Sequence, residues 1–128
     1  MIGADDFVLC AGTIPPGTTI TGTWAVPGSD GNAAVSFPIP AATALSDADV
    51  NFAPDASAVT ADDDPACAGS LTQPTAPRGK VCLYVQVVGA GAGSLGGYAI
   101  DRFGFFVYGL QSSPNNAAAR GTWAFTAP

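Results

Sequence analysis

Few residues in this 128-residue sequence have the types and spacing that catalysis requires. All ten acidic residues are aspartate and histidine is absent, which excludes Ser-His-Asp and Cys-His nucleophile arrangements and histidine metal sites. Hydrolysis by two carboxyl groups needs them about 5–9.5 Å apart, with one kept protonated in an apolar site. Asp101 alone lies inside an apolar strand pattern, and Arg102 follows it, so we expect a salt bridge or an exposed strand end there. The sequence therefore predicts a protein that is not an enzyme and needs no cofactor.

A glycine pattern imitates a dinucleotide-binding fingerprint but lacks its context. Gly91, Gly93 and Gly96 have the GxGxxG spacing and follow a good strand pattern. The fingerprint works by presenting backbone N–H groups at a helix N-terminus, whereas the residues that follow here, GGYAIDRFGFF, predict another strand. We interpret GAGAGSLGG, residues 89–97, as a flexible connection between strands.

Two groups of acidic residues have some of the features of cation sites. Asp47, Asp49 and Asn51 have the alternate spacing with which calcium loops begin, but the sixth and twelfth positions hold Phe and Ala where Gly and Glu are needed. Residues 62–64 are consecutive aspartates before a proline. A solvated acidic turn is the expected structure there, and a cation held in an irregular loop is the alternative. We predict no metal site.

The cysteines are three in number, so at least one is left without a partner inside the chain. Cys67 and Cys82 flank a segment rich in proline and glycine, and a bridge between them would stabilise the fold by about 3 kcal/mol by constraining the unfolded chain. On these residues alone, a bridge and two free thiols both remain open. Cys10 lies in the apolar run FVLCA and is expected to be a buried free thiol.

Charge and hydropathy exclude two classes of partner. The formal net charge is −6, and the four cations, Arg78, Lys80, Arg102 and Arg120, form no basic patch that could neutralise nucleic-acid phosphates. No run approaches the ~18 apolar residues needed to cross a bilayer, so we predict no membrane insertion. The N-terminal MIGADDF lacks the pattern of a signal peptide, which leaves open both a chain used without secretion and an excised part of a longer protein.

Strands dominate the predicted organisation. In residues 18–26, Ile20, Gly22, Trp24 and Val26 alternate with mainly threonine, the period of a half-buried strand. The 16 glycines and 11 prolines supply turns and leave helix scarce. Further strands bounded by turn residues are predicted at 6–11, 33–37, 49–53, 81–88, 101–110 and 120–126. About seven or eight short strands predict a single domain, residues 1–128, with an all-β antiparallel sandwich or jelly-roll-like fold.

A short phrase occurs near both ends of the chain, as GTWAV at 22–26 and as GTWAF at 121–125. The residues around the two copies do not match, so the chain is not a repeat protein. Two similar alternating strands are expected to pair or face each other. This arrangement would put Trp24 and Trp123 in one core and close the fold by joining its ends.

The predicted strands 81–88 and 101–110 are apolar on both faces, although an antiparallel sheet usually exposes one face to water. The second face is expected to meet another layer of the same chain or another subunit. If subunits meet there, the protein is a homo-oligomer, and analogy with viral decoration and fibre proteins suggests a trimer. The candidate subunit or core contacts are Val85, Val87, Phe103, Phe105, Phe106 and Tyr108.

Several phrases occur together in one order: TGTW, VSFPIP at 35–40, CAGS at 67–70, TAPRGKVCLYV at 75–85, RFGFFVY at 102–108 and the terminal GTWAFTAP. From about residue 10 to its end, the sequence resembles a family of uncharacterised actinobacterial β-domains found in surface and phage-associated proteins. The resemblance implies that Cys67 and Cys82 are a pair. Members often follow a secretion signal or membrane anchor, which implies an extracellular location.

Two functions follow from these observations. The first is a non-enzymatic structural protein at the surface of a virion, a capsid decoration protein or fibre-tip domain of an actinobacterial phage. The alternative is an adhesive or glycan-binding head at the surface of an actinobacterial cell. In that case sugars would stack on Trp24, Trp123, Tyr84, Tyr98 or Tyr108. Buried tryptophans favour the first function and exposed tryptophans the second.

Overall fold

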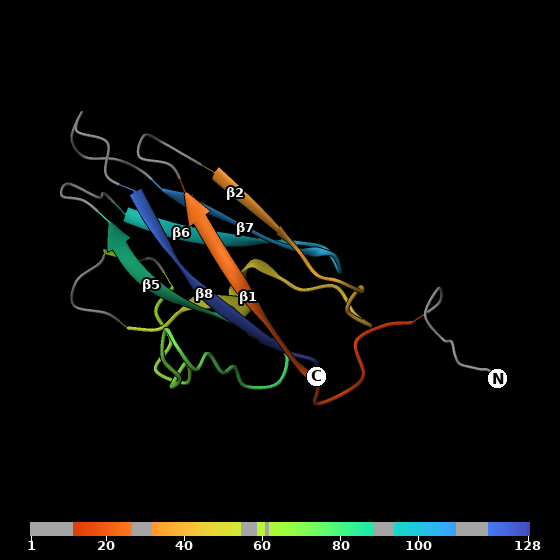
Figure 1. The fold of residues 1–128 in the computed structure, drawn as a ribbon. Coiled ribbons are helices and arrows are strands. Elements are labelled where there is room, and N and C mark those ends of the chain that lie inside the picture. Colours follow the sequence, from red (N-terminus) through yellow and green to blue (C-terminus); the bar gives the residue numbers. More distant parts are fainter. Residues whose placement is uncertain (1–11, 27–31, 55–58, 61, 89–93, 110–117) are drawn as a thin grey trace.

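The chain forms an all-β sandwich of two four-stranded sheets in a computed structural model that describes residues 12–26, 32–54, 59–60, 62–88, 94–109 and 118–128 (Figure 1). One sheet, here called the β8 sheet, has the strand order β1 (Thr19–Val26), β8 (Ala118–Thr126), β5 (Val81–Val88) and β3 (Val50–Phe52). The other, the β7 sheet, has the order β2 (Asn32–Ser36), β7 (Gly104–Gly109), β6 (Ser94–Ile100) and β4 (Val59–Thr60). A short 3₁₀ turn spans Asp47–Asp49. The predicted all-β sandwich is confirmed.

The central strands pair antiparallel, as predicted, and one parallel pair lies at an edge of each sheet. The antiparallel pairs are β1–β8, β5–β8, β2–β7 and β6–β7. The short strands β3 and β4 instead run parallel to β5 and β6. Between β3 and β5 the chain passes through β4 in the other sheet, so these strands are not joined by the tight turn that an antiparallel hairpin uses.

Aromatic side chains from both sheets fill the space between them. The ring of Phe37, which follows β2, stacks on Phe125 of β8 with centroids 4.8 Å apart. Phe105 of β7 meets Trp123 of β8 edge to face at 5.4 Å. Such aromatic pairs stabilise a core by about 0.5–1.5 kcal/mol beyond the area they bury. These contacts between the two sheets form a single hydrophobic core.

Two predicted segments are wrong in their boundaries. Residues 94–97 belong to strand β6 rather than to a flexible connection, and residues 101–103 form a turn between β6 and β7 rather than part of a strand. Asp101 has a φ of 48°, which fits a turn and not a strand. The glycines of this segment resemble a linker in the sequence. In the structure, Gly96 lies beneath the ring of Tyr108, where a Cβ would come within 2.3 Å of ring atoms. The predicted strand at 6–11, Cys10 and residues 89–93 lie outside the described residues.

Candidate functional site

The two tryptophans are buried beside each other on paired strands. In the register of β1 and β8, Trp24 is opposite Gly121 and Trp123 is opposite Gly22. Each side chain is 3% exposed. Trp24 donates from Nε1 to the Thr122 carbonyl at 3.1 Å and meets Phe52 edge to face. Both rings belong to the core, as the repeated GTWA phrase predicts, and neither presents a face on which a sugar could stack.

The outer face of β5 is covered by a loop of the same chain. Cys67 is bonded to Cys82, with Cα atoms 5.5 Å apart. The Tyr84 hydroxyl accepts a hydrogen bond from the Gly69 N–H at 2.9 Å and donates one to the Thr75 carbonyl at 2.6 Å. Cys67, Cys82 and Tyr84 are buried together beneath this loop. The second apolar face of this strand therefore meets its own chain at these positions, and not a subunit.

The remaining candidate contacts on β5 are Val85 and Val87. Val85 lies in the main core between the sheets. The side chain of Val87 lies outside the described residues.

The outer face of the β7 sheet, by contrast, carries aromatic rings that reach solvent. Phe105 and Val107 of β7 point into the core and are fully buried. Phe106 and Tyr108 point outward and are half-buried. Tyr98 of β6 is 38% exposed and stacks on Phe106, with centroids 5.0 Å apart, and its ring lies tilted against that of Tyr108, at 6.1 Å. We call Tyr98, Phe106 and Tyr108 the aromatic face.

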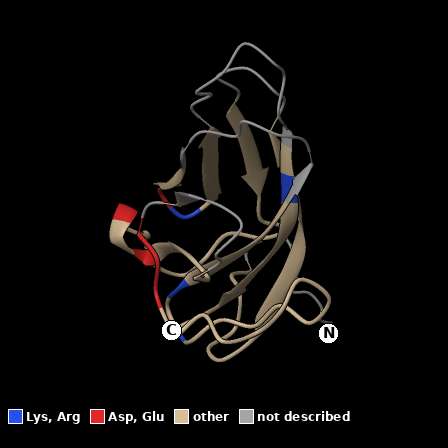
Figure 2. Cartoon of the chain, turned by 90° about the vertical axis from the view of Figure 1, so that its left-hand side faces the viewer, with Lys and Arg blue, Asp and Glu red and all other residues tan. Residues whose placement is uncertain are grey.

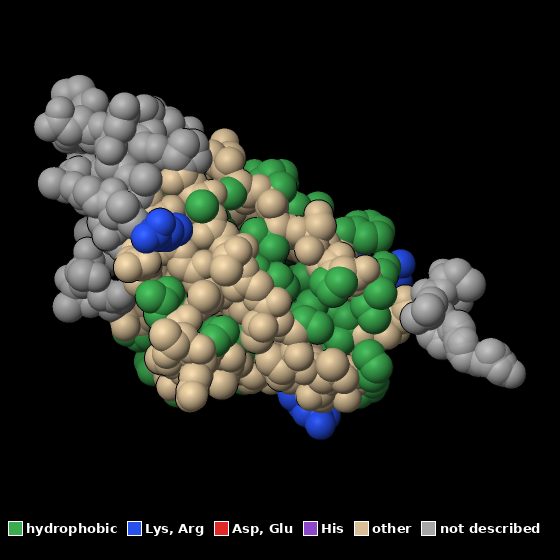
Figure 3. All heavy atoms as spheres, in the orientation of Figure 1, with side chains coloured by type: hydrophobic (Ala, Val, Ile, Leu, Met, Phe, Trp, Pro, Cys, Tyr) green, Lys and Arg blue, Asp and Glu red, His purple; other side chains and the backbone are tan. Residues whose placement is uncertain are grey.

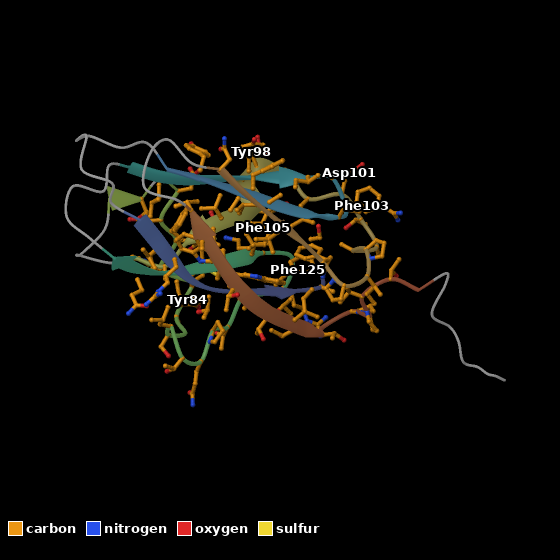
Figure 4. The ribbon with its side chains drawn as sticks, turned by 45° about the horizontal axis from the view of Figure 1, so that its top comes forward. Tyr84, Tyr98, Asp101, Phe103, Phe105 and Phe125 are labelled. Carbon is orange, nitrogen blue, oxygen red and sulfur yellow. A yellow bond between two sulfur atoms is a disulfide. The ribbon has the colours of Figure 1, made fainter. Side chains whose placement is uncertain are left out.

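The two outer faces lie on opposite sides of the sandwich. Figure 4 shows Tyr98 on one side and Tyr84 on the other, with Phe105 and Phe125 between them. Tyr98 is not among the subunit contacts predicted from the sequence. Its strand was interpreted as a connection as far as residue 97, and its pairing with Phe106 follows only from the register of β6 and β7.

The turn between β6 and β7 places Phe103 away from the aromatic face. Phe103 is 51% exposed at one end of the sandwich, and the Arg102 guanidinium lies 5.8 Å from its ring centroid (Figure 4). The backbone carbonyls of Asp101, Arg102 and Phe103 accept hydrogen bonds from residues 45, 41 and 37. Asp101 therefore occupies an exposed turn rather than an apolar strand. This position does not provide the apolar site in which a glycosidase keeps one carboxyl group protonated.

Most of the described acidic residues lie along one side of the molecule (Figure 2). The Asp47 carboxylate accepts the Ala99 N–H at 3.0 Å, which caps part of the open edge of β6. Lys80 pairs with Asp64, and this hydrogen bond, together with one from the Ala66 N–H, lowers the pKa of the Asp64 carboxyl. Within the described ranges, no three Asp or Cys side chains are placed to hold a metal ion.

A groove of about 390 Å³ lies on the outer face of the β8 sheet. Its lining residues come from β1, β8, β5 and the disulfide-bonded loop: Thr23, Trp24, Ala25, Leu71, Gln86, Arg120, Gly121 and Thr122. Arg120 donates from Nε to the Gln86 Oε1 at 3.1 Å. The sequence carries no local sign of this groove, because Ala25, Arg120 and Gln86 become neighbours only through the register of three strands.

Comparison with known proteins identifies no relative, since no family model, no curated protein and no solved structure matches the chain. Among the described residues, no helix is long and apolar enough to span a membrane. In the described part of the chain, two surfaces are therefore candidates for contact with a ligand or partner on geometry alone: the aromatic face on the β7 sheet and the groove on the β8 sheet.

Proposed function

We propose that this domain is a non-enzymatic structural protein that assembles with copies of itself through the aromatic face. The observation that supports this proposal is the cluster of three neighbouring rings, Tyr98, Phe106 and Tyr108, on the outer face of a sheet. Burial of one such side chain stabilises a contact by roughly 1.5–3 kcal/mol, so a flat cluster of three favours association.

The charge distribution favours a second copy as the partner. Copies of a chain with net charge −6 repel each other, and they meet at lowest cost where no carboxylate is brought into contact. On the outward-facing positions of β2, β7 and β6, the residues paired with the aromatic face are uncharged: Asn32, Ala34 and Gly96. A neutral sheet face is suited to an interface between copies of the chain.

The biological setting that we propose is the surface of a virion, as a capsid decoration protein or fibre-tip domain of an actinobacterial phage. The burial of Trp24 and Trp123 favours this role over a sugar-binding one that depends on exposed tryptophan. The resemblance of the sequence to domains of actinobacterial surface proteins counts instead toward the second candidate, described next. The trimer remains our expectation by analogy with viral decoration and fibre proteins.

An adhesive or glycan-binding head of a cell-surface protein is the second candidate. Tyr98 favours it, because its ring is 38% exposed and is held in a fixed orientation by its stack on Phe106. A rigid tyrosine that is apolar on its face and polar at its tip is suited to contact with a sugar ring.

Light scattering at micromolar concentrations of protein tests the assembly. We expect the wild-type chain to be oligomeric and Tyr98→Arg to be monomeric. Phe103→Arg is the matched control, since Phe103 is even more exposed but lies on the turn outside the aromatic face. A wild-type monomer, or equal behaviour of the two variants, would contradict the proposal. Binding of neutral glycans that is lost in Tyr98→Arg, by a monomeric wild type, would favour the second candidate.

A further inference from the structure

The groove on the β8 sheet is lined by one arginine, Arg120. Arg78 packs against Gly17, and Arg102 lies over the ring of Phe103. Arg120, by contrast, lies on the central strand of its sheet and lines the groove. The ion pair found in the described part of the chain joins Lys80 and Asp64, so Arg120 has no carboxylate partner there.

The hydrogen bond to Gln86 prepares Arg120 for an anionic group. A guanidinium has five N–H donors, and the bond from Nε to the Gln86 Oε1 uses one of them. No other described residue hydrogen-bonds the terminal amino groups, and their planar fork matches a carboxylate through two parallel hydrogen bonds. Because the side chain is already anchored at Nε, less conformational freedom is lost when a ligand binds.

The electrostatic environment also favours an anion at this groove. Figure 3, viewed from the side on which β1 lies in front, shows cationic side chains and no acidic side chain. The aspartates of residues 47–49 and 62–64 lie along the other side of the molecule (Figure 2). An anionic ligand that approaches the groove therefore avoids these described carboxylates.

Polar groups suited to hydroxyl groups surround the guanidinium. Thr23 and Thr122 are directly paired across β1 and β8 and face the groove. Thr122 donates its hydroxyl to the Leu71 carbonyl at 2.8 Å, which leaves its oxygen as an acceptor. Thr23 is exposed and can both donate and accept, and the Gln86 amide nitrogen supplies further donors. Leu71 adds an apolar wall from the disulfide-bonded loop.

The floor of the groove argues against recognition of an extended peptide. A peptide that binds to a sheet is usually held by main-chain hydrogen bonds at an open strand edge. Here the floor is β8, whose backbone is paired with β1 on one side and with β5 on the other. Recognition must therefore use the side chains, which suits a small ligand with several hydroxyl groups. The volume of about 390 Å³ falls within the range of small-molecule sites, roughly 300–1,000 Å³.

We propose that this groove binds an acidic sugar of the uronic acid type, with its carboxylate on Arg120 and its hydroxyl groups on Thr23, Thr122 and Gln86. The site lies on the opposite sheet from the aromatic face, so it goes beyond the proposed assembly and does not depend on it. In an assembled particle, the same geometry would leave the β8 sheet outward and free to meet a saccharide.

The test is titration of the full chain with digalacturonate, followed by NMR chemical shifts. We expect millimolar binding that weakens with added salt, a loss of about tenfold in affinity in Arg120→Gln, and a smaller loss in Arg120→Lys, which keeps the charge without the fork. Thr23→Val should also weaken binding. Arg102→Gln is the matched control and should bind as the wild type does. Both arginines lie at the surface, so unfolding curves are expected to be unchanged by these substitutions.

Two comparison ligands make the result decisive. Neutral galactobiose, which has the same ring hydroxyl arrangement without carboxylates, should bind more weakly than digalacturonate by about tenfold or more. A blocked Gly-Asp-Gly peptide supplies a carboxylate without sugar hydroxyl groups and should show no saturable binding. The proposal is overturned by absence of digalacturonate binding, by equal binding in Arg120→Gln, or by equal or tighter binding of either comparison ligand.

Discussion

The indole of Trp123 lies directly over Gly22, the residue with which it is paired on β1. A Cβ at residue 22 would come within 2.7–2.8 Å of three atoms of that ring. A similar relation holds for Trp24, which is opposite Gly121: a Cβ there would lie 2.9 Å from the Trp24 Nε1, and closer still, at 1.8 Å, to the Tyr84 carbonyl oxygen of β5. Each GTW phrase thus supplies the bulky ring for the other's glycine, and this antiparallel complementarity explains why the phrase occurs twice.

Gly22→Ala should therefore destabilise the fold. The added methyl group meets a ring that is packed against Phe37 and Phe105, so the indole cannot move aside without disturbing both sheets. Overpacking of this kind costs about 1–3 kcal/mol in the free energy of unfolding. Urea denaturation measures the change. Thr21→Ala, on the exposed face of the same strand, should stay within about 0.5 kcal/mol of wild type. Equal midpoints for the two variants would contradict the proposed packing.

Tyr84→Phe should loosen the loop that covers β5. The substitution keeps the ring but leaves the Gly69 N–H and the Thr75 carbonyl without their partner, at a cost of about 1–3 kcal/mol. Limited proteolysis should then cut between residues 68 and 76 sooner than in wild type. Tyr98→Phe removes a hydroxyl from the other sheet and serves as the control. If both variants resist proteolysis to the same extent, the hydroxyl does not hold the loop.

The disulfide should stabilise the same loop through the unfolded state. Closure of a loop with a sequence separation of 15 contributes about 3 kcal/mol in the chain-entropy description. We expect the double variant Cys67→Ala and Cys82→Ala to lower the free energy of unfolding by that order, with the β-sheet circular dichroism retained. Reduction of wild type should reproduce the loss. If thiol titration finds both cysteines free in the native protein, the bridge is absent under those conditions.

The fold was predictable where the information is local. The period of two in residues 18–26 and 120–126 predicts two half-buried strands, and their shared GTWA phrase predicts the pairing that joins them. Strand β6 was not predictable in this way. Its glycines resemble a linker, and Gly96 fits a strand only because the ring of Tyr108 on the next strand covers it.

The surfaces were less predictable than the strands, because they depend on contacts between distant segments. Tyr84 and Phe106 look alike in the sequence as outward aromatic residues of apolar strands. One is covered by the disulfide-bonded loop, and the other is left half-buried under Tyr98. The groove at Arg120 depends on strand register and on the position of Leu71. Neither the covering of Tyr84 nor the groove at Arg120 can be predicted from the spacing of residues along the chain.

The pair of Lys80 and Asp64 should make stability depend on pH in the acid range. The hydrogen bond from Lys80 holds the pKa of Asp64 below its usual value in the folded chain, so the unfolded chain binds a proton more readily. The stabilisation is therefore fully present above the unfolded carboxyl pKa of about 3.9 and is lost as the pH falls through the lowered folded value. Lys80→Met should lower the urea midpoint at neutral pH and converge with wild type in strong acid. Arg78→Met, which removes a neighbouring cation outside this pair, should give a curve parallel to wild type. Parallel curves for both variants would show that the Lys80–Asp64 contact does not set the acid response.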